Sequence, residues 1–393
     1  MEKYDANIKI AIKDICIENI DNIKVDQIGL IDYIDIASVD NKSKIISNFK
    51  TIDIKDAPSR AKQIIKKNDI LVSTVRPNLN AVAINNLISS NIQVCSTGFC
   101  VLRPKEYILP RYLFNFCKSD LFINEISRQA TGASYPAVNS RIIKNCQIPL
   151  PSLGEQKRIA AILDKATELI ALRKQQIKKL DLLVKSRFIE MFGECKTNPK
   201  NWKLLNMEEV ATVGSSKRVF VEELQEEGIP FYRGTEVGAL AEGKSITPEL
   251  YITEEHYKEL VKTTGIPQPG DLLMPSICPD GRIWVVNTEN PFYFKDGRVL
   301  WIHNINNKFN SIFLLYTLKN RIMTDYLSIA SGTTFAELKI FTLKKCKIFS
   351  VPLPLQKEFA AFVQQIDKTK STLQQSLEKL ELNYKALMQT YFG

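Results

Sequence analysis

Two segments of the chain place apolar side chains at the spacing of long amphipathic helices. Across the second segment the steps alternate between four and three residues, a 3.5-residue period typical of a helix packed along a partner, through Leu373, Leu377, Leu380, Tyr384 and Leu387. The first segment has similar steps, through Ile162, Ala166, Leu169, Ile177, Leu180 and Val184. Both patterns predict helices of about 36 residues, on the order of 54 Å long at 1.5 Å per residue.

Proline fixes where these helices can begin. Pro149-Leu150-Pro151 and Pro352-Leu353-Pro354 exclude helix upstream, and neither segment contains an interior proline. Ser152 and Glu155 have the spacing of a capping box that would open the first helix. The second copy lacks the Ser and the Glu, and it is three residues shorter between the proline pair and the glutamine.

A helix with so narrow an apolar stripe needs a partner helix. The nearest candidate is the other copy. Antiparallel packing would relate the two copies by an approximate two-fold axis, whereas a parallel pair would force one module to return along the full length of the helices. We therefore expect a coiled coil of two long antiparallel α-helices that separates two globular modules with pseudo-two-fold symmetry.

The chain is a tandem duplication at an offset of 200 residues. The sequence QKRIAAI at 156–162 matches QKEFAAF at 356–362, and ATGASY at 130–135 matches ASGTTF at 330–335. Cys146-x-Ile148 matches Cys346-x-Ile348, and Asn68-Asp69-Ile70-Leu71 resembles Gly270-Asp271-Leu272-Leu273. The duplication therefore includes the modules as well as the helices.

The modules have the pattern of α/β domains. Runs rich in β-branched and aromatic residues predict strands over 69–75, 99–102, 282–286 and 298–302. Apolar periodicity predicts helices over 112–127 and 312–329. The resulting organisation is a module at 1–150, a long helix at 151–193, a second module at 194–350 and a second long helix at 351–393.

Composition indicates a soluble globular protein, with 45% hydrophobic and 24% charged residues. No apolar run reaches the length of a membrane span, and the charged first twenty residues exclude a secretory signal, so we expect a cytoplasmic protein without membrane contact. The eight cysteines include no C-x-x-C pair and the chain has two histidines, which disfavours a metal site.

Recognisable catalytic motifs are missing from the sequence. There is no G-x-G-x-x-G, no G-x-x-x-x-G-K-[ST] and no Asn-Pro-Pro-aromatic methyltransferase motif. Acidic runs at 222–227 and 254–255 have the spacing of a solvated helix face. We therefore expect no catalytic residues in this chain.

The basic residues suggest a polyanion partner. Lys and Arg number 53 against 43 Asp and Glu, a net charge of +10 with a pI near 9.0. Arg can read purine edges, whereas Lys and hydroxyl groups mostly hold phosphates. The candidate DNA-binding residues are Arg60, Lys62, Arg76, Asn78, Thr131, Ser134, Tyr135, Arg141, Lys217, Arg218, Arg233, Arg282, Arg298, Thr333, Thr334 and Lys339. For each, an ordinary solvated position is the alternative, and a structural turn is the alternative for the loops at 131–135 and 331–335.

The arrangement of module, helix, module and helix resembles the specificity subunits of type I restriction-modification systems. The matching motif, preceded by a Thr-Gly-x-Ser loop, reads Pro149-Leu-Pro-Ser-Leu-Gly-Glu-Gln-Lys-Arg-Ile159. The resemblance spans the chain and implies that each module is a target recognition domain for one half of a bipartite, asymmetric DNA sequence. It also implies that the helices form the spacer.

The resemblance further implies partner proteins for double-stranded DNA modification. Two modification (methyltransferase) subunits would dock on the helices, and restriction (motor-nuclease) subunits, two where they are present, would join them. S-adenosylmethionine, ATP and Mg would bind to those partners and no cofactor to this chain. The altered proline motif of the second copy would change how the second modification subunit docks. A coiled-coil interaction scaffold without DNA binding, and an enzyme with an unrecognised site, are the alternative functions.

Overall fold

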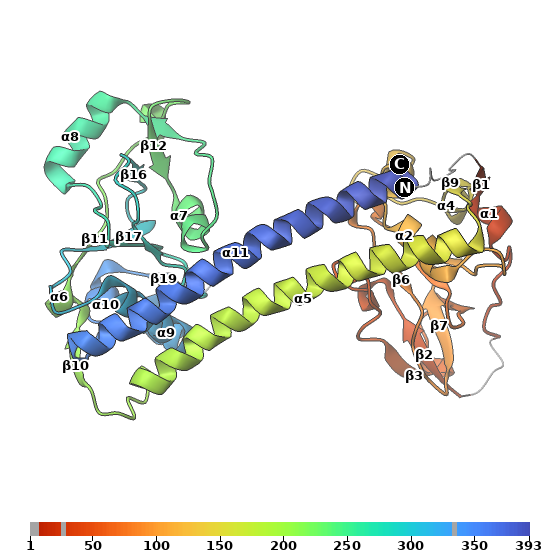
Figure 1. Ribbon diagram of the computed structural model, residues 1–393, viewed down its shortest axis with the longest axis horizontal. Helices are drawn as coiled ribbons and strands as arrows, with labels where there is room; N and C mark the ends of the chain where they lie inside the picture. Colours follow the sequence, from red (N-terminus) through yellow and green to blue (C-terminus); the bar gives the residue numbers. More distant parts are fainter. Residues whose placement is uncertain (1–7, 25–28, 332–335) are drawn as a thin grey trace. The chain divides into compact units, whose positions relative to one another are not determined.

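The computed structural model describes residues 8–24, 29–331 and 336–393, which form two compact units of mixed α/β structure (Figure 1). Unit 1 comprises Met1–Gln175 and Gln374–Gly393, and unit 2 comprises Gln176–Leu373. The expected boundaries at 150, 193 and 350 separate modules from helices. The compact units combine them, because each unit holds one module together with part of both long helices.

The long helices are α5 (Leu153–Phe192) and α11 (Leu353–Phe392), each of 40 residues. The Ser152 hydroxyl accepts the Glu155 N–H at 3.3 Å, while the Glu155 carboxylate pairs with Arg158 at 2.6 Å. The shorter proline motif of the second copy does not shift its helix, because α11 admits Pro354 in its first turn, where a missing N–H costs little.

Within each unit the two long helices contact each other in antiparallel order. In unit 1, Lys174 pairs with Glu381 at 2.7 Å. In unit 2, Asp181 pairs with Lys370 at 2.7 Å, and Arg187 pairs with Glu358 at 3.0 Å. Residue numbers therefore rise along α5 as they fall along α11.

Most residues of the predicted helix seam are sheltered from solvent. Val184 and Leu377 are buried, and eight more are half-buried, namely Ile162, Ala166, Ile177, Leu180, Leu373, Leu380, Tyr384 and Leu387. Leu169 was wrongly placed in this row: it is 40% exposed, and the half-buried neighbour is Ile170. The reason is the period, because steps of four and three lead from Ala166 through Ile170 and Arg173 to Ile177.

Unit 1 contains two main sheets and a two-stranded ribbon. Their orders are β3-β2-β7-β4, β6-β5-β8 and β1-β9. The strands are β1 (Lys9–Ala11), β2 (Leu30–Ile34), β3 (Lys50–Asp53), β4 (Ala61–Ile64), β5 (Ile70–Ser73), β6 (Val82–Ile84), β7 (Ile92–Ser96), β8 (Phe99–Leu102) and β9 (Gln147–Pro149). The helices are α1 (Ile12–Ile15), η1 (Ile36–Ser38), η2 (Ile54–Asp56), η3 (Pro77–Leu79), α2 (Pro110–Cys117), α3 (Asp120–Arg128) and α4 (Ser140–Asn145).

The helix expected over 112–127 is two helices. α2 ends at Cys117, and the Ser119 hydroxyl accepts the Phe122 N–H at 3.2 Å to cap α3. Apolar periodicity does not show this break, because Ser119 is itself buried and the pattern continues across it.

Unit 2 repeats this organisation. Its sheet orders are β13-β12-β16, β11-β17-β14-β15, β10-β20 and β18-β19. The strands are β10 (Lys203–Asn206), β11 (Thr212–Gly214), β12 (Ile229–Tyr232), β13 (Tyr251–Ile252), β14 (Leu272–Pro275), β15 (Trp284–Val285), β16 (Tyr293–Phe294), β17 (Val299–His303), β18 (Ala330–Ser331), β19 (Glu337–Leu338) and β20 (Lys347–Ser350). The helices are α6 (Met207–Val210), η4 (Val221–Glu223), α7 (Gly234–Ala241), α8 (Glu254–Thr264), α9 (Ser311–Ile329) and α10 (Ile340–Lys344).

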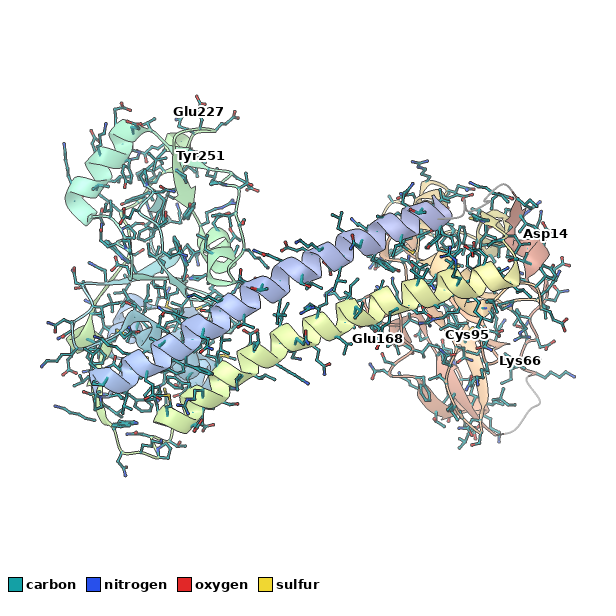
Figure 2. All side chains as sticks on the ribbon, viewed as in Figure 1. Asp14, Lys66, Cys95, Glu168, Glu227 and Tyr251 are labelled. Carbon is teal, nitrogen blue, oxygen red and sulfur yellow. The ribbon has the colours of Figure 1, made fainter. Side chains whose placement is uncertain are left out.

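The acidic run at 222–227 is not the helix face that the spacing indicated. Glu222 and Glu223 lie in the short turn η4, and Glu226 and Glu227 lie in the segment before β12 (Figure 2). All four side chains are exposed or half-buried, so the expectation of a solvated surface holds although the helix does not.

Corresponding strands pair in the same way in the two units. β2 and β7 are parallel, as are β12 and β16, and β5 and β8 are antiparallel, as are β14 and β17. The first ribbon, β1-β9, has its counterpart in β10-β20. The duplication seen in the sequence is therefore a duplication of the sheet framework.

One buried glutamine fixes the start of each long helix in its unit. Gln156 Oε1 accepts the Leu109 N–H at 2.8 Å, and its amide donates to the carbonyls of Tyr107 and Pro151. Gln356 does the same, accepting the Asn310 N–H at 2.8 Å and donating to the carbonyls of Lys308 and Val351. Both side chains are buried, and every partner is a backbone group.

Helix ends enter the module cores. In unit 1, Phe392 at the end of α11 packs on Tyr112 and Phe116 with ring centroids 5.3 and 5.6 Å apart. In unit 2, Phe192 at the end of α5 packs on Phe313 and Phe359 at 4.9 and 5.5 Å. Large buried aromatic rings contribute a few kcal/mol each, which explains why each module and its helix segments form one compact unit.

Candidate nucleic-acid interface

The ends of four strands form a basic pocket in unit 2. β12 and β16 are parallel, so the residues that follow them, Arg233 and Lys295, emerge at the same sheet edge. β14 and β17 are antiparallel, and the Ser276 N–H after β14 donates to the Arg298 carbonyl before β17 at 2.9 Å. Arg282 adds a fourth cation to the pocket wall.

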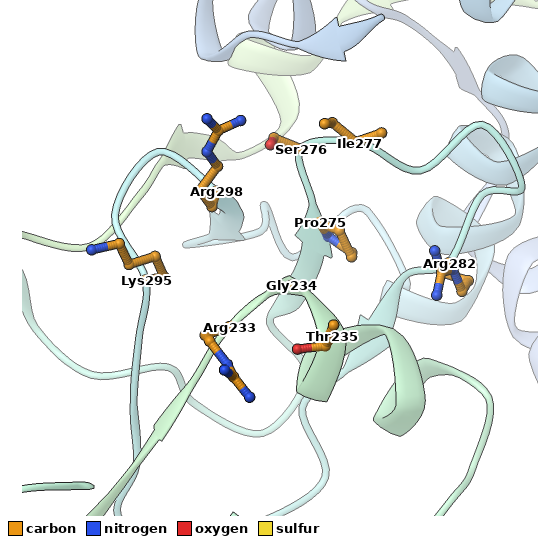
Figure 3. A pocket seen from close by; sticks show the side chains of 9 residues that line it. All are labelled: Arg233, Gly234, Thr235, Pro275, Ser276, Ile277, Arg282, Lys295 and Arg298. Atoms are coloured by element: carbon orange, nitrogen blue, oxygen red, sulfur yellow. The ribbon is translucent and has the colours of Figure 1, made fainter. Parts of the chain in front are cut away.

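The pocket has a volume of about 580 Å³ and is lined by Arg233, Gly234, Thr235, Pro275, Ser276, Ile277, Arg282, Lys295 and Arg298 (Figure 3). Figure 3 shows the side chains of Arg233, Arg282, Lys295 and Arg298 around Pro275 and Gly234. Three of these cations belong to the predicted DNA-binding set. Gly234, Thr235, Pro275, Ser276 and Ile277 were missed, because no strand was predicted over 229–232 or 272–275, and these residues lie at the ends of those two strands.

Each cation of this pocket already has a carboxylate partner. Arg233 pairs with Glu236 at 2.7 Å and with Glu249 at 2.9 Å. Arg282 pairs with Asp280 at 2.8 Å, and Lys295 lies 3.6 Å from Asp296. The carboxylates hold the cations in place, and donors of each guanidinium that the carboxylates do not use can still bind a phosphate.

Glu236 shows how strongly these pairs are held. Burial acts to raise the pKa of its carboxyl, but hydrogen bonds from the Arg233 guanidinium and backbone N–H overcome burial and lower the pKa to about 2. Glu236 therefore stays ionised at neutral pH and orients Arg233.

Glu337 links the candidate residue Lys339 to Arg298 of the pocket. Its carboxylate pairs with Arg298 at 3.2 Å and with Lys339 at 2.7 Å, and it accepts the Ser276 hydroxyl at 2.8 Å. Hydrogen bonding from Lys339 lowers the pKa of Glu337, despite partial burial. Arg298 and Lys339 are thus brought together.

Lys217 and Arg218 border the same region of unit 2. The Lys217 N–H donates to the Tyr293 hydroxyl at 2.9 Å, and Arg218 pairs with Asp296 at 3.3 Å. Both side chains are exposed. The predicted residues Thr333 and Thr334 lie outside the described residues.

Unit 1 brings several predicted residues to one edge of its sheets through backbone hydrogen bonds. The Thr97 N–H donates to the Arg60 carbonyl at 2.9 Å, and the Arg76 N–H donates to the Pro136 carbonyl at 2.7 Å. The loop 131–137 is closed by two hydrogen bonds of 2.9 Å between Thr131 and Ala137. Arg60, Arg76 and the exposed Thr131, Ser134 and Tyr135 therefore belong to connected loops.

The remaining candidates of unit 1 are also exposed. Lys62 lies on β4, Asn78 on η3 and Arg141 on α4. Exposure fits both a DNA contact and an ordinary surface position, so the structure leaves these three as predictions.

The described part of the chain shows neither a membrane-spanning helix nor a metal-ligand cluster. None of its helices is both long and apolar enough to cross a bilayer. The described ranges also contain no group of three or more His, Cys, Asp or Glu side chains that could hold a metal ion.

Comparison with known proteins gives the family. The model of the type I restriction modification DNA specificity domain matches twice, over residues 9–182 and 199–382. The chain belongs to this family. Specificity subunits are the DNA-recognition part of type I restriction-modification systems and are non-catalytic, working with separate methyltransferase and restriction subunits.

Curated relatives carry the same description. A putative type I restriction enzyme specificity subunit of Haemophilus influenzae is 26% identical over 282 residues, which cover 70% of this chain and 69% of the relative. The type I restriction enzyme MjaVIII specificity subunit of Methanocaldococcus jannaschii is 25% identical over 348 residues, which cover 83% and 78%. These names speak against the scaffold without DNA binding.

Solved structures share the fold. A chain from a study of complex assembly and conformational transition of the type I restriction-modification system superposes with a TM-score of 0.64 and 26% identity, over 98% of this chain and 97% of that one. The type I restriction-modification S subunit from M. genitalium gives a TM-score of 0.57 at 16% identity over 100% and 98%.

Proposed function

We propose that this specificity subunit reads a bipartite, asymmetric DNA target, one half with each unit. The observation that carries the proposal is a shared framework with different exposed residues. Strand pairing and the glutamine contacts repeat between the units. The exposed basic residues on that framework differ, so the two half-sites should differ in sequence.

The corresponding strand ends illustrate this difference. Arg233 and Lys295 follow β12 and β16 in unit 2, whereas Asp35 and Thr97 follow β2 and β7 in unit 1. Two cations in one unit thus correspond to an acid and a neutral hydroxyl in the other. Two units that share a framework but carry different residues at the strand ends would recognise different half-sites, as an asymmetric target requires.

We propose that α5 and α11 form an antiparallel coiled coil with pseudo-two-fold symmetry and fix the gap between the half-sites. Each helix runs without interruption from one unit into the other, and the ion pairs inside each unit are antiparallel. A continuous helix resists bending and so transmits a fixed length.

The same helices are proposed to dock two modification subunits. Large apolar side chains are exposed along them at Leu169, Leu172, Leu182, Leu183 and Leu382, between 40% and 68%. In unit 1 a groove of about 1310 Å³ is lined by parts of α5 and α11 and includes Leu382. Exposed apolar surface of this kind is typical of an interface with another protein.

The proposal assigns the chemistry to partners. S-adenosylmethionine would bind the modification subunits, and ATP and Mg would bind restriction subunits, of which two would join the assembly in systems that cut DNA. A cytoplasmic location is proposed with them, and the eight unpaired, buried thiols of the chain fit a reducing compartment.

The test is methylation by the chain together with its modification subunit. Sequencing of methylated positions should return one asymmetric motif of two parts separated by a constant gap. Binding of the complex to a duplex with that motif should weaken steeply as salt rises, because phosphate contacts release counterions. Methylation without sequence preference, or none with saturating methyl donor, would refute the proposal.

A further inference from the structure

Arg76 is held in a left-handed backbone conformation that residues other than glycine rarely adopt. It follows β5 with φ 48° and ψ 60°, and its N–H donates to the Pro136 carbonyl at 2.7 Å. Residues with a Cβ in this left-handed region are strained, and such strain persists where the surrounding structure requires it, often at functional sites. The side chain is exposed.

An exposed aromatic ring lies under the Arg76 guanidinium. The guanidinium carbon is 4.6 Å from the centroid of the Tyr135 ring, and Tyr135 is 67% exposed. The loop that carries Tyr135 is tightly closed: Gly132 has φ +102°, and a Cβ there would lie 2.9 Å from the Tyr135 carbonyl oxygen. Stacking on a ring holds the planar guanidinium in a fixed orientation.

The side-chain donors of Arg76 have no partner among the residues that the structure describes. In the described ranges the Arg76 side chain has no ion pair and no hydrogen bond, whereas Arg233, Arg282 and Arg298 of unit 2 each have a carboxylate partner. An oriented guanidinium with free donors is suited to a planar acceptor pair on a ligand.

Unit 2 has no arginine at the corresponding position. The carbonyl of Thr74 accepts the Val138 N–H at 2.8 Å, and the carbonyl of Ser276 accepts the Leu338 N–H at 2.8 Å, which aligns the two loops. Two residues after Ser276 is Cys278, which is buried. The stacked arginine is therefore a feature of unit 1 alone within this aligned pair.

We propose that Arg76 reads a guanine in the half-site bound by unit 1, and that Tyr135 positions it. This inference rests on the proposed function. The two outer donors of a guanidinium match the O6 and N7 acceptors of guanine in the major groove, the commonest specific contact between a protein and a base pair. Tyr135 acts through the guanidinium rather than on the base.

The experiment uses the assembled complex with its modification subunits and duplexes of the mapped target. Each guanine is replaced in turn by 7-deazaguanine, which lacks the N7 acceptor. At one guanine the substitution should weaken binding roughly 10- to 100-fold for the native chain and have no further effect for Arg76→Ala. Arg76→Lys keeps the charge but loses the planar guanidinium with its paired donors, so it should weaken the preference for guanine at the same position.

Tyr135 supplies a matched pair of variants. Tyr135→Phe retains the ring and should keep the guanine preference, while Tyr135→Leu should lose most of it. Loss of affinity by Arg76→Ala that is equal for all sequences would overturn the inference, because it would indicate a phosphate contact. A native complex without any bipartite preference would instead refute the proposed function.

Discussion

Gln156 and Gln356 perform the same structural task in the two units. Each buried amide bonds to three backbone groups: one N–H and one carbonyl in the segment before α2 or α9, and the carbonyl of Pro151 or Val351 just before the long helix. A buried backbone group without a partner costs about 1–3 kcal/mol, so replacing the glutamine by an apolar residue of equal size lowers the stability of the unit. These contacts explain why a glutamine stands at the same position near the start of both long helices.

Gln156→Leu should destabilise unit 1. The substitution leaves the Leu109 N–H and two carbonyls unpaired, and we expect the free energy of unfolding to fall by about 2–4 kcal/mol. Chemical denaturation measures this change. Gln175→Leu on the exposed face of the same helix is the control and should alter stability by less than about 0.5 kcal/mol. If Gln156→Leu lowered the free energy of unfolding no more than Gln175→Leu, the buried contacts of Gln156 would not contribute to stability.

At the residue scale, the sequence indicated which side chains could contact DNA, but it did not indicate which protein groups those side chains would bind. Arg233, Arg282 and Arg298 were selected as candidate DNA contacts, and the structure pairs each with a carboxylate that the sequence analysis did not select. For Arg298 that partner is Glu337, 39 positions away in the chain. Tyr135 and Arg76 were both selected, but their stacking depends on a loop closure between residues some sixty positions apart in the chain, which no local pattern specifies.

At the scale of elements, the long helices were the most predictable part of the fold. Their apolar period and flanking prolines are local signals, and the structure differs from them mainly at Leu169 and in length, 40 residues rather than about 36. The sheets were less predictable. Strand positions such as 99–102 follow from composition, but the pairing of β2 with β7 joins residues far apart in sequence and is decided by packing.

Leu380→Asp should weaken the contact between the two long helices in unit 1. Leu380 is half-buried in the helix seam, and an aspartate there would place an unpaired charge among apolar side chains. We expect a loss of about 2–4 kcal/mol in the free energy of unfolding. Leu382→Asp, at a position that is 68% exposed on the same helix, is the control and should be nearly neutral. An unchanged free energy of unfolding for Leu380→Asp would show that packing between the two long helices at this position does not stabilise unit 1.

At the scale of the whole molecule, duplication and divergence act on different parts of the chain. The framework positions are repeated, including the pairing registers and the two glutamines. The strand-end residues differ, as Arg76 and Cys278 illustrate. Under the proposed function, the repeated framework with different strand-end residues would recognise two different half-sites, and the long helices would set the gap between them.

The proposed spacer role of the long helices is tested most directly by removing one heptad from each helix, residues 170–176 and 374–380. The methylated motif of the shortened chain with its modification subunit is then mapped. Seven residues shorten a helix by roughly 10 Å, and the heptad register is preserved. If the long helices set the gap, both half-sites should keep their bases while the gap between them shortens by about three base pairs. An unchanged gap, or altered bases in either half-site, would contradict this role.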